Sequence, residues 1–190
     1  VRNADGSNDH MVIAGQLPAW SPDGTQIAYV SNGIYVVNAD GTGAHKVSPG
    51  PPAAMDNSLY PTWSPDGSRI AFVSGGGDVA LVKVTGTGAH GISPVGAYRP
   101  AWSPDGSRLA FQVVASPGIY SVNTDGTAYG VLVNPGGTLG DPTWSPDASQ
   151  LVFTVYDGGP ELLYRINVNG TGYSQVTAGA GMDILSNWGR

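Results

Sequence analysis

The sequence contains no cysteine, few charged residues and no long apolar run. Without cysteine, disulfides, thiolate catalysis and cysteine-ligated zinc are all excluded. Charged residues make up only 12% of the 190 positions, and the helix formers glutamate and lysine occur only as Glu161, Lys46 and Lys83. No apolar stretch approaches the roughly 18 residues that a membrane-spanning helix needs. These shortages argue against a mainly helical protein, a disulfide-stapled protein and a protein with a membrane-spanning helix.

Glycine and aromatic residues are abundant instead. The chain has 29 glycines, 15 prolines, five tryptophans and nine tyrosines, and 41% of its residues are hydrophobic. This composition provides material for turns and for a packed core, and it argues against a disordered chain. The formal net charge is −6, so the basic surface typical of nucleic-acid-binding proteins is missing. We therefore expect no nucleic acid among its partners.

One short pattern recurs along the whole chain. The segment Pro18-Ala19-Trp20-Ser21-Pro22-Asp23-Gly24 returns with small changes around three later tryptophans, and the start of a fifth copy surrounds Trp188. Successive tryptophans are separated by 43, 39, 42 and 44 residues. A period of about 40–45 residues is typical of the four-stranded blade of a β-propeller. The repeats therefore begin near Trp20, Trp63, Trp102, Trp144 and Trp188.

The second repeat has the expected strands in their plainest form. Residues 69–73 alternate polar and apolar side chains, as a half-buried strand does, and residues 79–84 form a further apolar run. Ser64-Pro65-Asp66-Gly67 has the composition of a tight turn, and a short polar segment at 90–93 is typical of an edge strand. The other repeats follow the same order, with Asp-Gly or Asn-Gly hairpin turns. We predict an all-β propeller of four-stranded blades with about five blade positions.

The two ends of the chain match parts of a single blade. Residues 1–6 match the end of a third strand, residues 9–13 have the pattern of a fourth strand, and residues 184–188 match a first strand. We treat residues 1–190 as one propeller domain. Either the termini pair and close a five-position ring, or the chain is a piece of a longer propeller with about six to eight blades. Because the sequence begins with Val1, we expect a processed or trimmed chain.

The repeated Pro-x-Trp-Ser-Pro-Asp-Gly stretch, followed by a hairpin and an Asp-Gly turn, resembles the TolB-type β-propeller repeat. The resemblance covers essentially the whole chain and implies a periplasmic or cell-surface location in a bacterium. The same repeat is found in periplasmic TolB, in the propeller domains of prolyl-oligopeptidase-type peptidases and in bacterial surface proteins. It therefore implies a fold more firmly than an activity.

The residues that could carry catalysis or bind a metal are better explained as parts of the repeat. The aspartates of the Ser-Pro-Asp turns suit backbone hydrogen bonds within each turn. His10, His45 and His90 occupy equivalent places in three repeats, where they would point outward in different directions. The tryptophans suit packing between blades rather than sugar stacking. No nucleophile elbow, phosphate loop or dinucleotide fingerprint is present. We predict no catalytic residue, no metal and no cofactor.

A binding site is expected where equivalent positions of the repeats differ chemically. The residue before each Pro-x-Trp proline is Leu17, Tyr60, Arg99 or Asp141. In the family that the chain resembles, these innermost strands line the central channel. We predict that Tyr60, Tyr98, Arg99 and Asp141 form a ligand-binding channel mouth. Arg99 would anchor a carboxylate, or pair with Asp141 in the empty state; alternatively, these residues are solvated loop ends.

We therefore expect a non-catalytic binding or scaffold module that recognises a protein, peptide or glycan through the channel mouth and its loops. The loop at residues 50–57 is distinctive and could contribute, since binding residues often lie on irregular loops. Two alternatives stay open. The chain could be the propeller portion of a prolyl-oligopeptidase-type peptidase without its hydrolase domain, or a purely structural repeat of a cell-surface protein. The expected location is periplasmic or extracellular.

Overall fold

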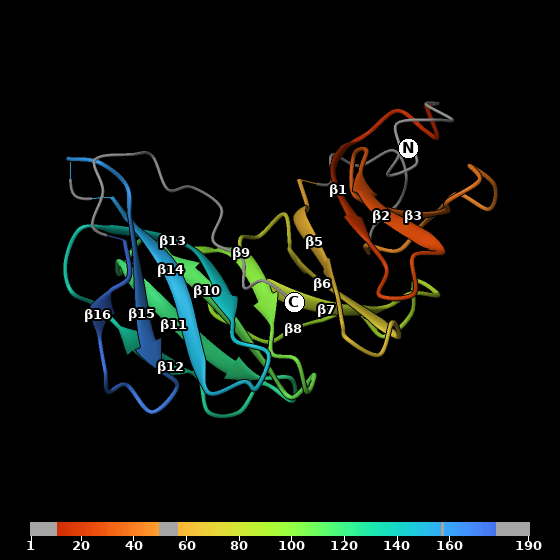
Figure 1. Cartoon of the computed structure of the whole chain (residues 1–190). Coiled ribbons are helices and arrows are strands. Elements are labelled where there is room, and N and C mark those ends of the chain that lie inside the picture. Colours follow the sequence, from red (N-terminus) through yellow and green to blue (C-terminus); the bar gives the residue numbers. More distant parts are fainter. Residues whose placement is uncertain (1–10, 50–56, 157, 178–190) are drawn as a thin grey trace.

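The computed structural model describes residues 11–49, 57–156 and 158–177. Over these ranges the chain forms 16 strands and no helix. The strands make four antiparallel sheets of four, each built from consecutive strands (Figure 1). The predicted all-β class with four-stranded blades is confirmed. The predicted segments at 1–6 and 184–188, the first two residues of the predicted strand at 9–13, which include His10, and most of the 50–57 loop lie outside the described residues.

Each sheet corresponds to one sequence repeat. The first consists of β1 (Gln16–Trp20), β2 (Gln26–Val30), β3 (Ile34–Asn38) and β4 (His45–Lys46). The second consists of β5 (Leu59–Trp63), β6 (Arg69–Val73), β7 (Val79–Lys83) and β8 (His90–Gly91). The third consists of β9 (Ala97–Trp102), β10 (Arg108–Val113), β11 (Gly118–Asn123) and β12 (Gly130–Val133). The fourth consists of β13 (Thr138–Trp144), β14 (Gln150–Tyr156), β15 (Leu162–Asn167) and β16 (Ser174–Gln175).

The Ser-Pro-Asp turn joins the first two strands of each sheet by side-chain hydrogen bonds. In the second sheet, Asp66 Oδ1 accepts from Ser64 Oγ at 2.5 Å and from the Ser68 amide at 3.0 Å, and Ser64 Oγ accepts from the Arg69 amide at 2.9 Å. The Ser64 bond and then the Ser68 bonds lower the pKa of Asp66 to about 2. The carboxylate thus stabilises the turn through these hydrogen bonds. The equivalent carboxylates of Asp23, Asp105 and Asp147 accept the same bonds in their own turns.

Neighbouring sheets are joined through the repeated tryptophan. The indole Nε1 of Trp63 donates to the carbonyl oxygen of Ala19 at 3.0 Å, that of Trp102 to Thr62 at 3.1 Å, and that of Trp144 to Ala101 at 3.0 Å. These three side chains are only 6–9% exposed. Around them, apolar residues of adjacent sheets form three continuous clusters, centred on the fully buried Phe72, Phe111 and Phe153.

The four sheets follow one another as an arc in chain order, from the red and orange first sheet to the blue fourth (Figure 1). Adjacent sheets contact each other through their first strands, β1, β5, β9 and β13. One detail of the sequence prediction is wrong. Residues 11–13, the described part of the expected strand at 9–13, are not in a strand. Val12 and Ile13 instead pack against the face of the first sheet that carries Ile27 and Tyr29.

Candidate functional site

The residue before the proline has the same unusual backbone in all four sheets. The φ angle is 48° at Leu17, 56° at Tyr60, 51° at Arg99 and 53° at Asp141, all in the left-handed region. The register between the first and second strands shifts at each of these positions, as in a β-bulge. A bulge bends a strand and redirects a side chain. Here the four redirected side chains all line one cavity between the first strands.

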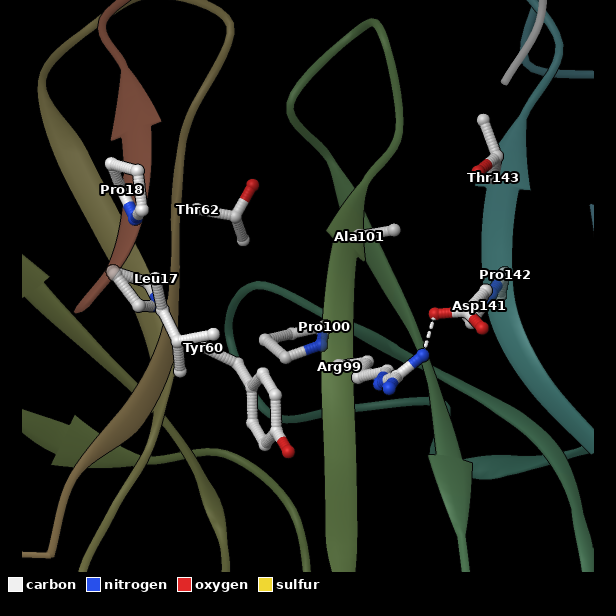
Figure 2. A pocket seen from close by; sticks show the side chains of 11 residues that line it. Leu17, Pro18, Tyr60, Thr62, Arg99, Pro100, Ala101, Asp141, Pro142 and Thr143 are labelled. Carbon is white, nitrogen blue, oxygen red and sulfur yellow. Dashed lines mark hydrogen bonds and ion pairs between the residues drawn. The ribbon is translucent and has the colours of Figure 1, made fainter. Parts of the chain in front are cut away.

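This cavity has a volume of about 370 Å³ and is lined by equivalent short segments of β1, β5, β9 and β13 (Figure 2). It shares Thr62, Pro100, Ala101 and Thr143 with a second cavity of about 730 Å³, which is lined by the tryptophans and prolines of the repeated turns. The two cavities form one groove along the first strands. We call it the inner groove, and we call its end near Arg99 the mouth.

The mouth contains an ion pair between two sheets. Arg99 Nη1 on β9 donates to Asp141 Oδ1 on β13, and Figure 2 shows Arg99 reaching from one strand to the other. The side chain of Arg99 is 42% exposed and that of Asp141 10%. Burial alone would lower the pKa of Arg99, but the hydrogen bond and the charge of Asp141 outweigh it and raise this pKa. The pair therefore leaves one side of the guanidinium open to solvent.

Three tyrosines surround this ion pair. The Arg99 guanidinium carbon lies 5.8 Å from the ring centroid of Tyr60, within the range of a cation–π contact. Tyr60 and Tyr98 meet edge to face, with their centroids 6.4 Å apart. Tyr156 Oη donates to Asp141 Oδ2 at 3.1 Å. Burial, followed by the negative charge of Asp141, raises the pKa of Tyr156, so this phenol stays protonated near neutral pH.

The structure brings all four predicted site residues together. Tyr60, Tyr98 and Arg99 also line an adjoining cavity of about 460 Å³, and Asp141 is bonded to Tyr156, which lines the same cavity. The pairing of Arg99 with Asp141, one of the two arrangements expected from the sequence, is the one present. That these residues bind a ligand remains a prediction.

The contribution of the second strands to the mouth was not predicted from the sequence. Gln112 on β10 and Tyr156 on β14 line the adjoining cavity. A Cβ atom on Gly140 would lie 3.1 Å from the Tyr156 ring, so glycine at this position makes room for the tyrosine. The absence of a side chain at position 140, where the other repeats have Gln16, Leu59 and Tyr98, was the signal in the sequence.

Histidines and carboxylates do not form a metal site in the described part of the chain, where no three such residues cluster. His45 Nε2 instead lies 2.9 Å from the carbonyl oxygen of Val84, which links the first and second sheets, and its Nδ1 lies 3.0 Å from that of Gly43. His90 Nδ1 lies 2.9 Å from the carbonyl oxygen of Gly88. No helix long and apolar enough to cross a membrane occurs in the described ranges.

Comparison with known proteins points to one fold family. The sequence model of the TolB β-propeller domain family matches residues 32–189 of this chain. A putative TolB from Agrobacterium tumefaciens has 26% sequence identity and a TM-score of 0.75, over 88% of this chain and 63% of that one. TolB from Acinetobacter baumannii has 23% identity and a TM-score of 0.64, over 86% and 41% of the two chains.

The fold is also similar to that of an enzyme. A puromycin-hydrolysing peptidase from Mycobacterium tuberculosis has 18% identity and a TM-score of 0.67, over 86% of this chain and 29% of that one. The present chain thus spans less than two thirds of each of these three solved chains. No curated protein matches the sequence.

Proposed function

The chain belongs to the TolB β-propeller domain family, and we propose that it is a non-catalytic module that binds a protein, peptide or glycan at the mouth of the inner groove. The observation that carries this proposal is the set of left-handed residues at the mouth. Their side chains differ from repeat to repeat, although their backbone does not. A position with a constant backbone and a variable side chain is not dictated by the repeat, so its chemistry is free to serve a ligand.

The energetic cost of these positions supports a role for their side chains. A left-handed backbone costs an ordinary L-residue roughly 1–2 kcal/mol, whereas glycine adopts it freely. Glycine would satisfy the fold at such a position, yet the first three repeats have Leu17, Tyr60 and Arg99 there. Strained residues of this kind are often found at ligand sites.

The chemistry of the mouth suits a ligand that carries an acidic group next to an apolar or aromatic group. The side chain of Arg99 is 42% exposed, so its guanidinium can also donate hydrogen bonds to a carboxylate of a ligand. Tyr60 and Tyr98 provide aromatic area next to it, and the prolines of the inner groove extend the apolar surface away from the charge. Tyrosine and arginine are among the side chains enriched at binding hot spots.

The propeller portion of a peptidase is the second candidate, and the fold similarity to the Mycobacterium tuberculosis peptidase favours it. The complete reading frame separates the two candidates. A Gly-x-Ser-x-Gly motif followed by Asp and His downstream of Arg190 would support the peptidase. A stop codon there would support the binding module.

We further propose a periplasmic or extracellular location, which rests on membership of the TolB family. Fractionation of cells that express the intact gene tests it. Recovery in the periplasm or at the cell surface supports the proposal, and recovery in the cytosol of a product without an export signal contradicts it.

Binding is tested with a panel of peptides and glycans that includes acidic and neutral members. The protein is screened beside Arg99→Ala and the matched control Arg165→Ala, which removes an exposed arginine from β15, where Arg165 Nε donates to Ser174 Oγ at 3.1 Å, away from the inner groove. We expect Arg99→Ala to weaken binding of an acidic ligand at least about tenfold, equivalent to about 1.4 kcal/mol. Arg165→Ala should leave binding unchanged. Equal affinities for all three proteins would exclude Arg99 from the site.

A further inference from the structure

Two cavities of different character meet at Arg99 and Tyr60. The cavity at the mouth of the inner groove, with about 370 Å³, and the adjoining cavity, with about 460 Å³, share these two residues in their linings. Leu17 and the prolines make the groove side apolar, whereas Gln112 and Thr138 place polar side chains in the adjoining cavity. A ligand held at Arg99 therefore has an apolar space on one side and a polar space on the other.

Gln112 on β10 presents an unused side-chain amide to the adjoining cavity. This amide forms no hydrogen bond within the described part of the chain. Its Oε1 lies 3.6 Å from the place that a Cβ atom on Gly140 would take, and Tyr156 Oη lies 3.5 Å from the same place. The missing side chain at position 140 thus leaves space in front of both groups. Because a carboxamide donates and accepts hydrogen bonds, it is complementary to a peptide group.

The charge that the mouth exposes is positive. The side chain of Asp141 is largely buried, and its two carboxylate oxygens accept hydrogen bonds from Arg99 and from Tyr156. The side chain of Arg99 is the more exposed of the pair. A carboxylate of a ligand can therefore reach the guanidinium, whereas an ammonium group would have to displace a bond that Asp141 already accepts.

We propose that the mouth binds the free C-terminal carboxylate of a peptide whose last residue is apolar, an inference that rests on the proposed binding function. The terminal carboxylate accepts hydrogen bonds from Arg99, the last side chain enters the inner groove, and the last peptide bond lies against Gln112. The preceding residues of the peptide leave past Tyr98 and Val114, which are both exposed at the edge of the adjoining cavity.

The prolines of the inner groove distinguish a chain end from an acidic side chain within a longer chain. Proline has no N–H group, so a peptide that continued through the groove would find none of these donors for its backbone carbonyl groups. An apolar side chain needs no such donor. In a C-terminal residue, a single carbon atom carries the carboxylate, the side chain and the peptide nitrogen, so all three reach their places where the two cavities meet. The prolines concerned are Pro18, Pro61, Pro100 and Pro142 (Figure 2).

The aromatic side chains of the mouth favour a peptide over an acidic sugar. A sugar ring needs an open aromatic face on which to stack. The Arg99 guanidinium lies over the Tyr60 ring, with its carbon 5.8 Å from the centroid, and Tyr98 contacts Tyr60 edge to face. The apolar wall of Leu17 and the prolines also offers nothing to sugar hydroxyl groups, whereas it suits an aliphatic side chain.

Retention of peptide pools on the immobilised full chain tests whether a chain end is recognised. Each pool holds N-acetylated tetrapeptides that are randomised at the first three positions and end in leucine. One pool has free carboxylates, a second has C-terminal amides, and a third has C-terminal amides with glutamate fixed before the leucine. We expect the free-acid pool to bind at least about tenfold more tightly than either amide pool. Arg99→Ala should remove this difference, and the control Arg165→Ala should keep it.

An ester in place of the last peptide bond tests the role of Gln112. The ester keeps the carboxylate and the side chain but removes the N–H group that Gln112 Oε1 would accept. We expect it to weaken binding of the most strongly retained free-acid peptide about fivefold in the wild-type protein, and less than about twofold in Gln112→Ala, where the acceptor is already gone. The matched control Gln175→Ala, on β16, should respond like the wild type. An equal loss in Gln112→Ala and the wild type would overturn the contact with Gln112.

The same measurements separate the C-terminal carboxylate from the proposed function. Equal retention of the free-acid and amide pools, or retention of the glutamate pool as strong as that of the free acids, would overturn recognition of a chain end. If a glycan with a uronic acid then binds in a manner that requires Arg99, the binding function of the mouth stands and only its ligand changes. If no peptide and no glycan binds, the C-terminal carboxylate and the proposed function both fail.

Discussion

Arg99 on β9 and Asp141 on β13 form an ion pair across two sheets, and both residues have a left-handed backbone, with φ angles of 51° and 53°. The two features are related. The bulge that produces the positive φ turns each side chain toward the inner groove, where residues from neighbouring repeats meet. The fold thus creates equivalent positions at the mouth, and the sequence gives each one a different chemistry.

Glycine should relieve the strain at Leu17, whose φ is 48° and whose side chain is 41% exposed. We expect Leu17→Gly to be more stable than Leu17→Ala by about 1 kcal/mol, because alanine keeps the left-handed strain and glycine does not. Urea unfolding measures the difference. The control is Ala19→Gly on the same strand, where φ is not positive, and there glycine should destabilise. A Leu17→Gly variant less stable than Leu17→Ala would show that this backbone is not strained.

The ion pair at the mouth should contribute little to stability. Arg99 is 42% exposed, and exposed ion pairs are typically worth about 0.2–1 kcal/mol. A double-mutant cycle with Arg99→Met and Asp141→Asn should give a coupling energy in that range; asparagine tolerates the left-handed backbone at position 141. A coupling energy of several kcal/mol would mean that the pair holds the third and fourth sheets together and is not available to a ligand.

Acid should destabilise the Ser-Pro-Asp turns. The pKa of Asp66 is about 2 in the folded protein, below the ordinary value of 3.8. A lowered folded pKa stabilises the protein above the unfolded pKa, and this contribution is lost as the pH falls from about 4 through about 2. We therefore expect Asp66→Asn to lower the urea midpoint at pH 6, and the difference from wild type to shrink toward pH 2. A difference that is independent of pH would contradict the role of the ionised carboxylate.

The third and fourth sheets each carry a stack of three aromatic rings. In the third sheet, the Tyr129 ring lies 5.5 Å from that of Tyr120 and 6.3 Å from that of Phe111. The equivalent residues of the first two repeats are Ala44 and Ala89. Aromatic pairs contribute about 0.5–1.5 kcal/mol each, so we expect Tyr129→Ala to destabilise by about 1–2 kcal/mol in a denaturant titration. No loss of stability would show that the stack is incidental.

Much of this fold could be predicted from the sequence because the signal is repeated. The Trp-Ser-Pro-Asp pattern marks the turn from the first to the second strand of every sheet, and the burial of Trp63, Trp102 and Trp144 between sheets agrees with the packing role expected of them. The gathering of Tyr60, Tyr98, Arg99 and Asp141 was also predictable, since equivalent positions of neighbouring repeats lie on adjacent strands.

Other features depend on geometry that the sequence does not display. A residue before proline is normally extended, so the left-handed φ of Tyr60 or Arg99 could not be anticipated. The contribution of Tyr156 depends on the register between β13 and β14, which shifts at the bulge between Gly140 and Thr143. Residues 11–13 have the composition of a strand, but they lie over the face of the first sheet as an irregular segment.

The most direct test of the binding site is the substitution Tyr60→Gly. It removes a side chain that lines the mouth, and it relieves the left-handed strain at a φ of 56°. Relief of that strain should offset the lost contacts with Arg99 and Tyr98, so that stability stays within about 1 kcal/mol of wild type. Calorimetric titration with the tightest ligand from the panel should then show affinity reduced at least about tenfold. Unchanged affinity in a folded Tyr60→Gly protein would contradict a binding site at the mouth of the inner groove.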